Sequence, residues 1–435
     1  QAQSHNQNLY KNNAYRSMAD VLIDDLKKRF AQDPYMSIDM SKKHRLFAWD
    51  WLRSPYSFYE LVGIFPRFDR SVFSREKNQC GEMRLIYRLA YEKIEKGEKL
   101  YSRLPLSVNL VFHLKKGADN VSDDDPDKGT EGESEESCQQ SALSWLSLES
   151  KELSQLKTTL FSLQNLKSLE VNLQSVRWPS TVRPDYGGYA EYIMRVFKRD
   201  SQQKIFFPSF MENMIDVEKL KNNARLRGEL LDHLKSSESI EDVDRGTISL
   251  PNKFLAKKAI SVAFHGLHRK RNRPFDQIFK ASDFASINFN NHQYVKSPQS
   301  FLRRLNDMTC VGCHQGRAIA GFHFVGIDKE KSFSANKVKM AMSGHLSGDL
   351  PRRRHYLKTL LRGENPEQAR PFSERADVEL GKYGAHCGLS GDASFKSWSC
   401  ESGLTCQRIF SGDQSPVGVC PVSYTHLRAH ETAQY

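Results

Sequence analysis

The sequence lacks several features that would assign it to a common class of protein. It has no uninterrupted run of 18 or more apolar residues, so no stretch has the length and composition of a membrane-spanning helix. It also lacks a phosphate-binding loop pattern, Gly-x-Gly-x-x-Gly, Gly-x-Ser-x-Gly and His-Glu-x-x-His. The usual sequence signatures of nucleotide-binding proteins, serine hydrolases and zinc proteases are therefore missing.

The two ends of the sequence also lack ordinary features. The chain begins at Gln1 without an initiator methionine or a recognisable signal peptide, which predicts either a mature or a truncated N-terminus. Near the other end, VSYTHLRAHET at 422–432 resembles the translation of a sequencing adapter, so we interpret residues 422–435 as a non-native tail. His426, His430 and Glu431 are therefore excluded as metal ligands.

Cysteine is scarce, but two of the eight cysteines stand in a patterned run, CVGCH at 310–314. A shuffled chain of this composition would contain such a run roughly 0.005 times, so chance is a poor explanation. Positions i, i+3 and i+4 share one face of a helix, where Cys310, Cys313 and His314 could address one flat ligand. Ser297 as N-cap and Pro298 in the first turn predict that helix.

In this run the sequence resembles the c-type cytochromes, in which two thiols add to the haem vinyl groups and the adjacent imidazole binds the iron. The resemblance implies one covalent haem c, attached to Cys310 and Cys313, with His314 as the proximal ligand. A plain disulfide or redox pair and a zinc site are the alternatives. A zinc site needs a second ligand pair, yet the next cysteine is Cys387, and a thioredoxin-like pair needs a βαβ context that is not visible.

For the second axial position of the haem we predict His345, which gives a six-coordinate, low-spin iron suited to electron transfer. Gly344 beside it permits a close approach of the chain. Met340, Met342 and His323 remain as alternative ligands, and an open position would instead favour catalysis.

The other six cysteines are even in number, which permits three disulfides: Cys80, Cys138, Cys387, Cys400, Cys406 and Cys420. The first two flank the same end of a predicted hairpin and are expected to bond to each other. The last four allow three connectivities, which the sequence leaves open. Disulfides and covalent haem both predict a bacterial periplasmic or secreted location.

Alternating apolar residues predict antiparallel strands at 83–91 and 106–114, and further strands are expected at 166–176, 190–198 and 204–210. A helix at about 216–234, with Val217, Leu220, Leu230, Leu231 and Leu234 facing inward, is expected to close this sheet. The predicted fold class is α+β, with an N-terminal antiparallel-sheet domain carrying helices, a mainly helical c-haem region and a small disulfide-rich C-terminal module.

The predicted domain order follows from these patterns and the composition. Residues 1–75 form a helical, aromatic-rich lead segment, and 76–245 form the α+β sheet domain with a disordered acidic loop at 115–137. Residues 246–375 form the helical haem-binding region, with one helix at 349–363, and 376–421 form the cysteine-rich module.

The net charge of +12 is unevenly distributed, since residues 119–136 hold nine acidic residues against one lysine. Basic runs at 268–273 and 351–358 could meet an acidic redox partner or anionic lipid, or form solvated faces, while nucleic acid is the least expected partner outside the cytoplasm. The predicted function is electron transfer by a single-haem c-type cytochrome. The alternatives are a peroxidase-like haem enzyme, and a binding or adhesion protein with a sensory or structural haem.

Overall fold

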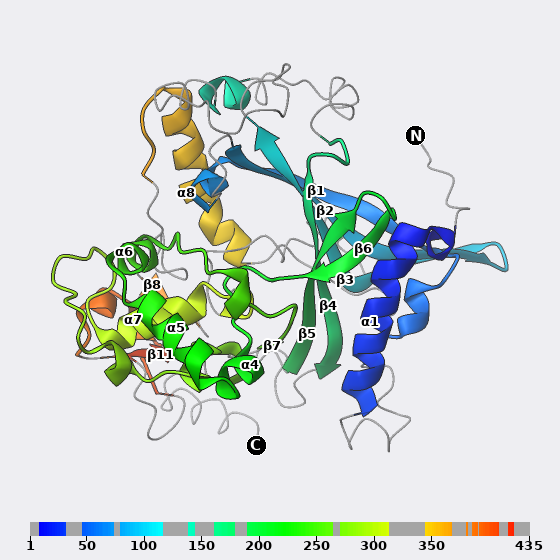
Figure 1. Ribbon diagram of the computed structural model, residues 1–435. Coiled ribbons are helices and arrows are strands. Elements are labelled where there is room, and N and C mark those ends of the chain that lie inside the picture. Colours follow the sequence, from blue (N-terminus) through cyan, green and yellow to red (C-terminus); the bar gives the residue numbers. More distant parts are fainter. Residues whose placement is uncertain are drawn as a thin grey trace. The chain divides into compact units, whose positions relative to one another are not determined.

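Figure 1 shows the computed structural model of the chain. It describes residues 8–31, 46–73, 79–115, 138–143, 161–178, 189–263, 270–312, 344–367, 380–381, 385–389, 391–408 and 416–421. These residues divide into two compact units. The first, here the sheet unit, holds the described residues up to Met211, Lys257–Ile260 and helix α8 (Gly344–Leu361). The second unit holds Glu212–Ala256, residues 261–312 and the described residues from 380 onward.

An antiparallel sheet forms the centre of the sheet unit, as predicted, and with the helices it confirms the α+β class. Its strands lie in the order β1-β2-β3-β4-β5-β6, and β7 also pairs with β5. Their bounds are β1 (Ser57–Arg67), β2 (Gln79–Glu95), β3 (Glu98–Lys115), β4 (Leu166–Trp178), β5 (Tyr189–Asp200), β6 (Ile205–Ser209) and β7 (Lys258–Ala263).

The predicted hairpin is confirmed and is longer than expected. Strands β2 and β3 pair from Glu95 opposite Glu98 down to Gln79 opposite Lys115. Lys96 and Gly97 form the two-residue turn with φ of 53° and 81°, a left-handed pair that matches the twist of the two strands.

Helix α1 (Asn13–Ala31) covers one face of the sheet. Its fully buried residues, Met18, Leu22 and Leu26, recur at helical spacing and pack into a cluster with strand residues that alternate along the sheet. The strand residues of this cluster include Leu89, Leu106, Val108, Val171, Leu173, Ile193 and Phe197. In this core, the buried residues of α1 recur about every 3.6 positions and those of the strands every second position.

Buried ion pairs connect α1 to this sheet. Arg29 of α1 donates from Nη2 to Glu191 Oε2 of β5 at 3.0 Å, and the Glu191 side chain is fully buried. One turn earlier, Asp25 accepts from Arg195 Nε at 2.7 Å and also contacts Lys258.

A second buried ionic cluster connects α8 to the short helical turn η4 (Phe68–Phe73). Arg352 donates to both Asp349, at 2.7 Å, and Asp69, at 2.8 Å. Burial alone would raise the pKa of Asp349, but the charges of Arg353 and Arg352 hold that pKa below its ordinary value. Burial likewise acts to raise the pKa of Glu82 on β2, but three neighbouring cations, Arg70, Arg84 and Lys167, hold that pKa well below its ordinary value.

The predicted Cys80–Cys138 disulfide is present and joins residues 58 apart in the sequence. It ties the start of β2 to a helical segment at 138–143, where Gln139 Nε2 donates to Leu361 O of α8 at 2.9 Å. Residues 116–137, and with them nearly all of the loop predicted to be disordered, lie outside the described residues.

Two sequence predictions about local structure are wrong. The lead segment was expected to be helical throughout; helix α1 agrees with this, but residues 57–67 form strand β1. Its pairing with β2 shifts register between Leu61 and Gly63, and this irregularity breaks the alternation that would have revealed a strand. Strand β7 also lies in a region expected to be mainly helical.

The second unit contains α4 (Val217–Lys221), α5 (Ala224–Leu234), α6 (Ser237–Arg245) and α7 (Pro298–Asp307). The single helix predicted at 216–234 is two helices, because Asn223 caps α5 by accepting from Leu226 N at 2.9 Å. Of the five residues predicted to face inward, Leu220, Leu230 and Leu234 are buried, whereas Val217 and Leu231 are only partly buried.

Short segments complete the two units. The cysteine-rich module is built on β8 (Leu380–Gly381), β9 (His386–Gly388), β10 (Ser399–Cys400) and β11 (Val417–Val419). Single 3₁₀ turns lie at η1 (Leu9–Lys11), η3 (Trp49–Leu52), η7 (Asn252–Phe254), η9 (Lys270–Asn272), η10 (Phe275–Gln277), η11 (Ala281–Phe284) and η13 (Ala393–Phe395). In the described part of the chain, no helix has the length and apolar character that crossing a bilayer requires.

Candidate functional site

Helix α7 leads into the cysteine run and begins as the sequence predicts. Ser297 Oγ accepts from Ser300 N at 3.0 Å, and Pro298 occupies the first turn. The helix ends at Asp307, however, so Cys310 lies in the turn after α7 and not on its face. The prediction that one helical face carries the whole motif is therefore wrong for Cys310.

We name residues 308–312 the Cys310 turn. Thr309 is fully buried, and its hydroxyl donates to Asn306 O at 2.7 Å while accepting from Gly312 N at 2.9 Å. This bridge folds the turn back onto the last turn of α7. A Cβ atom on Gly312 would lie 1.9 Å from Asn306 O, so only glycine fits where the backbone returns.

Cys310 belongs to none of the three disulfides in the described structure. Its side chain is 8% exposed, and Sγ lies 3.6 Å from the carbonyl oxygen of Glu212. The neighbouring Val311 is fully buried. The Cys310 thiol thus lies on a buried, hydrogen-bonded turn three residues before Cys313.

Asn306 connects the end of α7 to the turn η10 and is 1% exposed. Its Oδ1 accepts from Phe275 N at 2.9 Å, and its Nδ2 donates to Asp276 Oδ1 at 2.7 Å and to Leu302 O at 2.9 Å. One side chain therefore fixes both the helix terminus and a loop 31 residues away in the sequence.

The charged residues of α7 are also buried. Arg303 Nε donates to Asp307 Oδ2 at 2.8 Å, and burial raises the pKa of Asp307 above its ordinary value. Arg304 donates to the carbonyl oxygens of Val243 and Asp244, both at 3.0 Å, at the C-terminal end of α6. Burial lowers the pKa of Arg304 to about 10.

Asp244 completes this arrangement by binding backbone groups. Its carboxylate accepts from the N–H groups of Gln293, Tyr294 and Val295 at 2.7 to 2.8 Å. These bonds hold the segment that enters α7. Helix α7, which leads into the Cys310 turn, is consequently held by side-chain hydrogen bonds at both of its ends.

The other predicted site residues are not brought to this turn by the described structure. Cys313, His314, His323, Met340 and Met342 lie outside the described residues. His345 is the second residue of α8, in the sheet unit, whereas Cys310 belongs to the second unit. Axial ligation by His314 and His345 stays a prediction.

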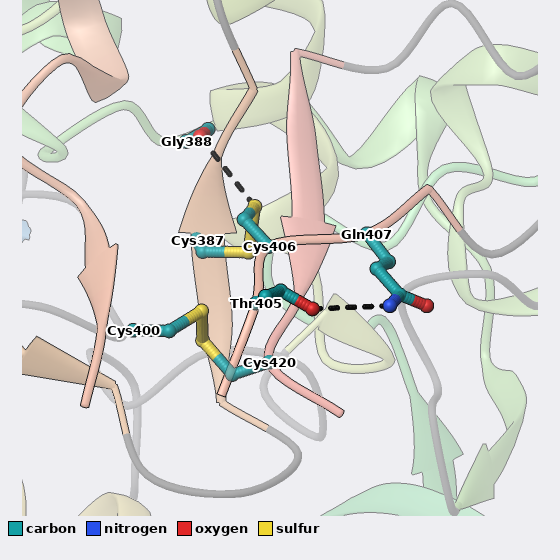
Figure 2. The surroundings of a disulfide bond; sticks show 7 residues. All are labelled: Cys387, Gly388, Cys400, Thr405, Cys406, Gln407 and Cys420. Atoms are coloured by element: carbon teal, nitrogen blue, oxygen red, sulfur yellow. Dashed lines mark hydrogen bonds between the residues drawn. A yellow bond between two sulfur atoms is a disulfide. The ribbon is translucent and has the colours of Figure 1, made fainter. Parts of the chain in front are cut away.

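The cysteine-rich module contains a second cluster of sulfur atoms (Figure 2). Its disulfides pair Cys387 with Cys406 and Cys400 with Cys420, which selects one of the three connectivities that the sequence left open. The Sγ atoms of Cys387, Cys400 and Cys406 all lie within 4.8 Å of one another. Such spacing would suit a metal ion held by thiolates, but disulfide sulfur carries no negative charge to offer.

Sequence reasoning missed the residues that build the Cys310 turn. Thr309 directly before the first cysteine was a usable signal, because threonine readily bonds nearby backbone groups. The role of Asp244 left no local signal, since its partners are about 50 residues away in the sequence.

Comparisons with known proteins give no relatives for this chain. No protein-family model, no curated protein and no solved structure matches it.

Proposed function

We propose that the chain carries one covalent haem c at the Cys310 turn and functions in electron transfer. The observation that supports it most is the position of Cys310, on a buried and hydrogen-bonded turn that leads directly into Cys313 and His314. A rigid anchor of this kind limits the movement of an attached group, which suits electron transfer between fixed positions.

The donor set of the run fits the chemistry of haem attachment. Each thiol adds its S–H across one vinyl double bond, so a thioether forms, the hydrogen passes to the vinyl group, and no external oxidant or reductant is needed. Cys310 and Cys313 would hold the haem, and the His314 imidazole would bind its iron. When bound, the haem supplies a one-electron couple.

The burial of Cys310 adds a requirement on timing. A thiol that is 8% exposed and packed against a backbone carbonyl is not accessible to a group as large as haem. Attachment therefore precedes the final packing of the Cys310 turn. Folded apoprotein mixed with haem should form no thioether, whereas a chain that meets haem during export and folding should.

We propose a periplasmic or secreted location in a bacterium. Three disulfides support an oxidising compartment, and covalent haem is attached in such a compartment in the c-type cytochromes that the run resembles.

An acidic redox protein is the proposed partner, and α8 offers it a basic face. Arg352 and Arg353 bind Asp349 and are not available. Arg354, His355 and Lys358 are exposed and line an open cavity of about 330 Å³ together with Leu350 and Pro351. Complementary charge of this kind mainly raises the rate of association, so partner reduction should slow as salt increases.

The haem itself is tested by expressing the protein with a c-haem maturation system. We expect one haem per chain in a pyridine haemochrome assay, and a tryptic peptide containing residues 310–314 that carries the mass of haem. Cys310→Ala should leave a single thioether and a shifted haemochrome band. A Cys80→Ala/Cys138→Ala variant is the matched control and should keep both thioethers. A folded wild-type protein without covalent haem would rule out the proposal.

The distal ligand has its own test. We propose His345, so His345→Ala should convert a low-spin spectrum to high-spin or allow carbon monoxide to bind the iron. An unchanged spectrum would exclude His345 and direct the search to Met342, Met340 and His323. A wild-type haem that is already high-spin would favour catalysis over electron transfer.

A further inference from the structure

The cysteine-rich module places its two disulfides close together. Cys387, Cys400 and Cys406 come from both disulfides, yet their Sγ atoms lie within 4.8 Å of one another. Glycine at 418, opposite Cys387 in the β9–β11 pair, leaves room beside Cys406, since a Cβ there would lie 2.6 Å from Gln407 O and 3.1 Å from Cys406 Sγ. Figure 2 shows the two bonds side by side.

Access to the four sulfur atoms is unequal. Cys387 and Cys420 are fully buried, whereas Cys400 and Cys406 are partly exposed. Each disulfide therefore joins one partly exposed cysteine to one buried cysteine. Because exchange needs direct attack by a thiolate, an external thiol can reach only the accessible member of each pair.

We propose that the module is a thiol–disulfide exchange site for an external dithiol, with Cys406 as its entry sulfur and Cys400 as its internal acceptor. This activity is separate from the proposed haem.

The first step is attack at Cys406. One thiolate of the external dithiol bonds to Cys406 Sγ, the Cys387–Cys406 bond breaks, and Cys387 leaves as a thiolate. The Cys400 sulfur lies within 4.8 Å of it.

The second step passes the free thiolate from Cys387 to Cys420. Cys387 attacks Cys400 Sγ, a Cys387–Cys400 disulfide forms, and Cys420 leaves as a thiolate and takes up a proton. The second thiolate of the dithiol then attacks its own sulfur in the mixed disulfide and releases Cys406, which is also protonated. The dithiol becomes a disulfide, and the module gains two thiols, at Cys406 and Cys420.

A monothiol distinguishes this pathway from simple reduction. It has no second thiol to release the mixed disulfide, so it stays bonded to Cys406. Existing thiols are first blocked with an alkylating reagent, glutathione is added in limiting amount under native conditions, and a second reagent labels the newly released thiol. Non-reducing peptide mapping should find glutathione on Cys406, a Cys387–Cys400 bond and a label on Cys420. A label on Cys387 with Cys400–Cys420 intact, or glutathione on Cys400, would overturn the proposal.

Limiting dithiothreitol provides a second measurement on the unmodified chain. Molecules that have gained two thiols within the module should contain Cys387–Cys400 and labelled Cys406 and Cys420, whereas retention of either original pair in these molecules contradicts exchange. A Cys400→Ser/Cys420→Ser variant lacks the acceptor, so in it glutathione should leave the label on Cys387. The isolated Cys80–Cys138 bond serves as an internal reference for reduction without exchange.

Discussion

In the sheet unit, several buried charged side chains bind one another. In the second unit Arg303 and Asp307 do so too, but other buried polar side chains, among them Asp244 and Asn306, bind the backbone. Arg29 pairs with Glu191 across 162 residues of sequence, and Arg352 lies between two aspartates. In the second unit, Asp244 accepts three backbone N–H groups, and Asn306 serves Phe275 N and Leu302 O.

The difference follows from where the backbone finds its partners. A sheet satisfies its own N–H and C=O groups, so its buried side chains are available for ion pairs. The second unit contains long irregular segments whose buried backbone groups need side-chain partners. A side-chain pair can be replaced as a pair, but a backbone partner cannot be removed by substitution.

The largest effect is expected from breaking one ion pair in the sheet unit. Arg29→Met removes the guanidinium that binds the fully buried Glu191 carboxylate and should cost about 3–5 kcal/mol of the free energy of unfolding. Arg29→Met/Glu191→Met removes both charges and should recover most of that loss. Urea unfolding of the two variants measures both values. If the double variant is no more stable than the single one, the pair is not an independent, replaceable unit.

In the second unit, Asp244→Ala should cost about 3 kcal/mol, since one buried and two partly buried N–H groups lose their acceptor. Asp244→Asn keeps one oxygen and should lose less. Hydrogen exchange at Gln293, Tyr294 and Val295 should accelerate in the alanine variant. Unchanged protection there would show that other groups satisfy this segment.

Gly312→Ala should cost about 2 kcal/mol, because the added methyl group meets Asn306 O at 1.9 Å and the turn must shift. Gly228→Ala is the matched control: it lies inside α5 with no atom within 4 Å of the added carbon, so it should gain about 0.5–1 kcal/mol. Thermal unfolding should therefore give shifts of opposite sign for the same substitution.

The smallest effect concerns pH, where one carboxylate from each unit should act in opposite directions. The folded pKa of Glu82 is depressed, so its stabilisation is complete above the ordinary value of about 4.3 and is lost as the pH falls. The folded pKa of Asp307 is raised by burial, so its contribution declines as the pH rises above about 3.9.

Unfolding of Glu82→Gln and Asp307→Asn between about pH 3 and 7 tests this contrast, with a slope of up to about 1.4 kcal/mol per pH unit for each group. The deficit of Glu82→Gln relative to wild type should grow with pH, and that of Asp307→Asn should shrink. Slopes of the same sign would contradict the assignment of Asp307.

Sequence patterns predicted the elements that depend on neighbouring residues. The β2–β3 hairpin follows from alternation, the start of α7 from Ser297 and Pro298, and the Cys80–Cys138 bond from their positions beside the hairpin. Strand β1 was missed because its register shift interrupts the alternation, and the division of α4 from α5 because Asn223 was not recognised as a cap.

At the candidate site, the sequence identified Cys310 by its motif but not the structure that holds it. The bonds from Asn306 to Phe275 and from Asp244 to Tyr294 join residues 31 and 50 positions apart. Such contacts depend on how the loops fold back and leave no periodic signal. The pairing of the last four cysteines is likewise decided by β9 and β11, which are too short to predict.

The overlapping order of the two disulfides in the cysteine-rich module has a consequence for proteolysis. The Cys387–Cys406 bond closes a loop over residues 387–406, and the Cys400–Cys420 bond closes a loop over residues 400–420, so the two loops overlap at 400–406. A protease that cuts the exposed stretch around Ser402 and Gly403 therefore releases no fragment. With Cys387 bonded to Cys400 instead, the same single cut would detach everything beyond it, so a change of disulfide partner would turn a nick-resistant end into a cleavable one.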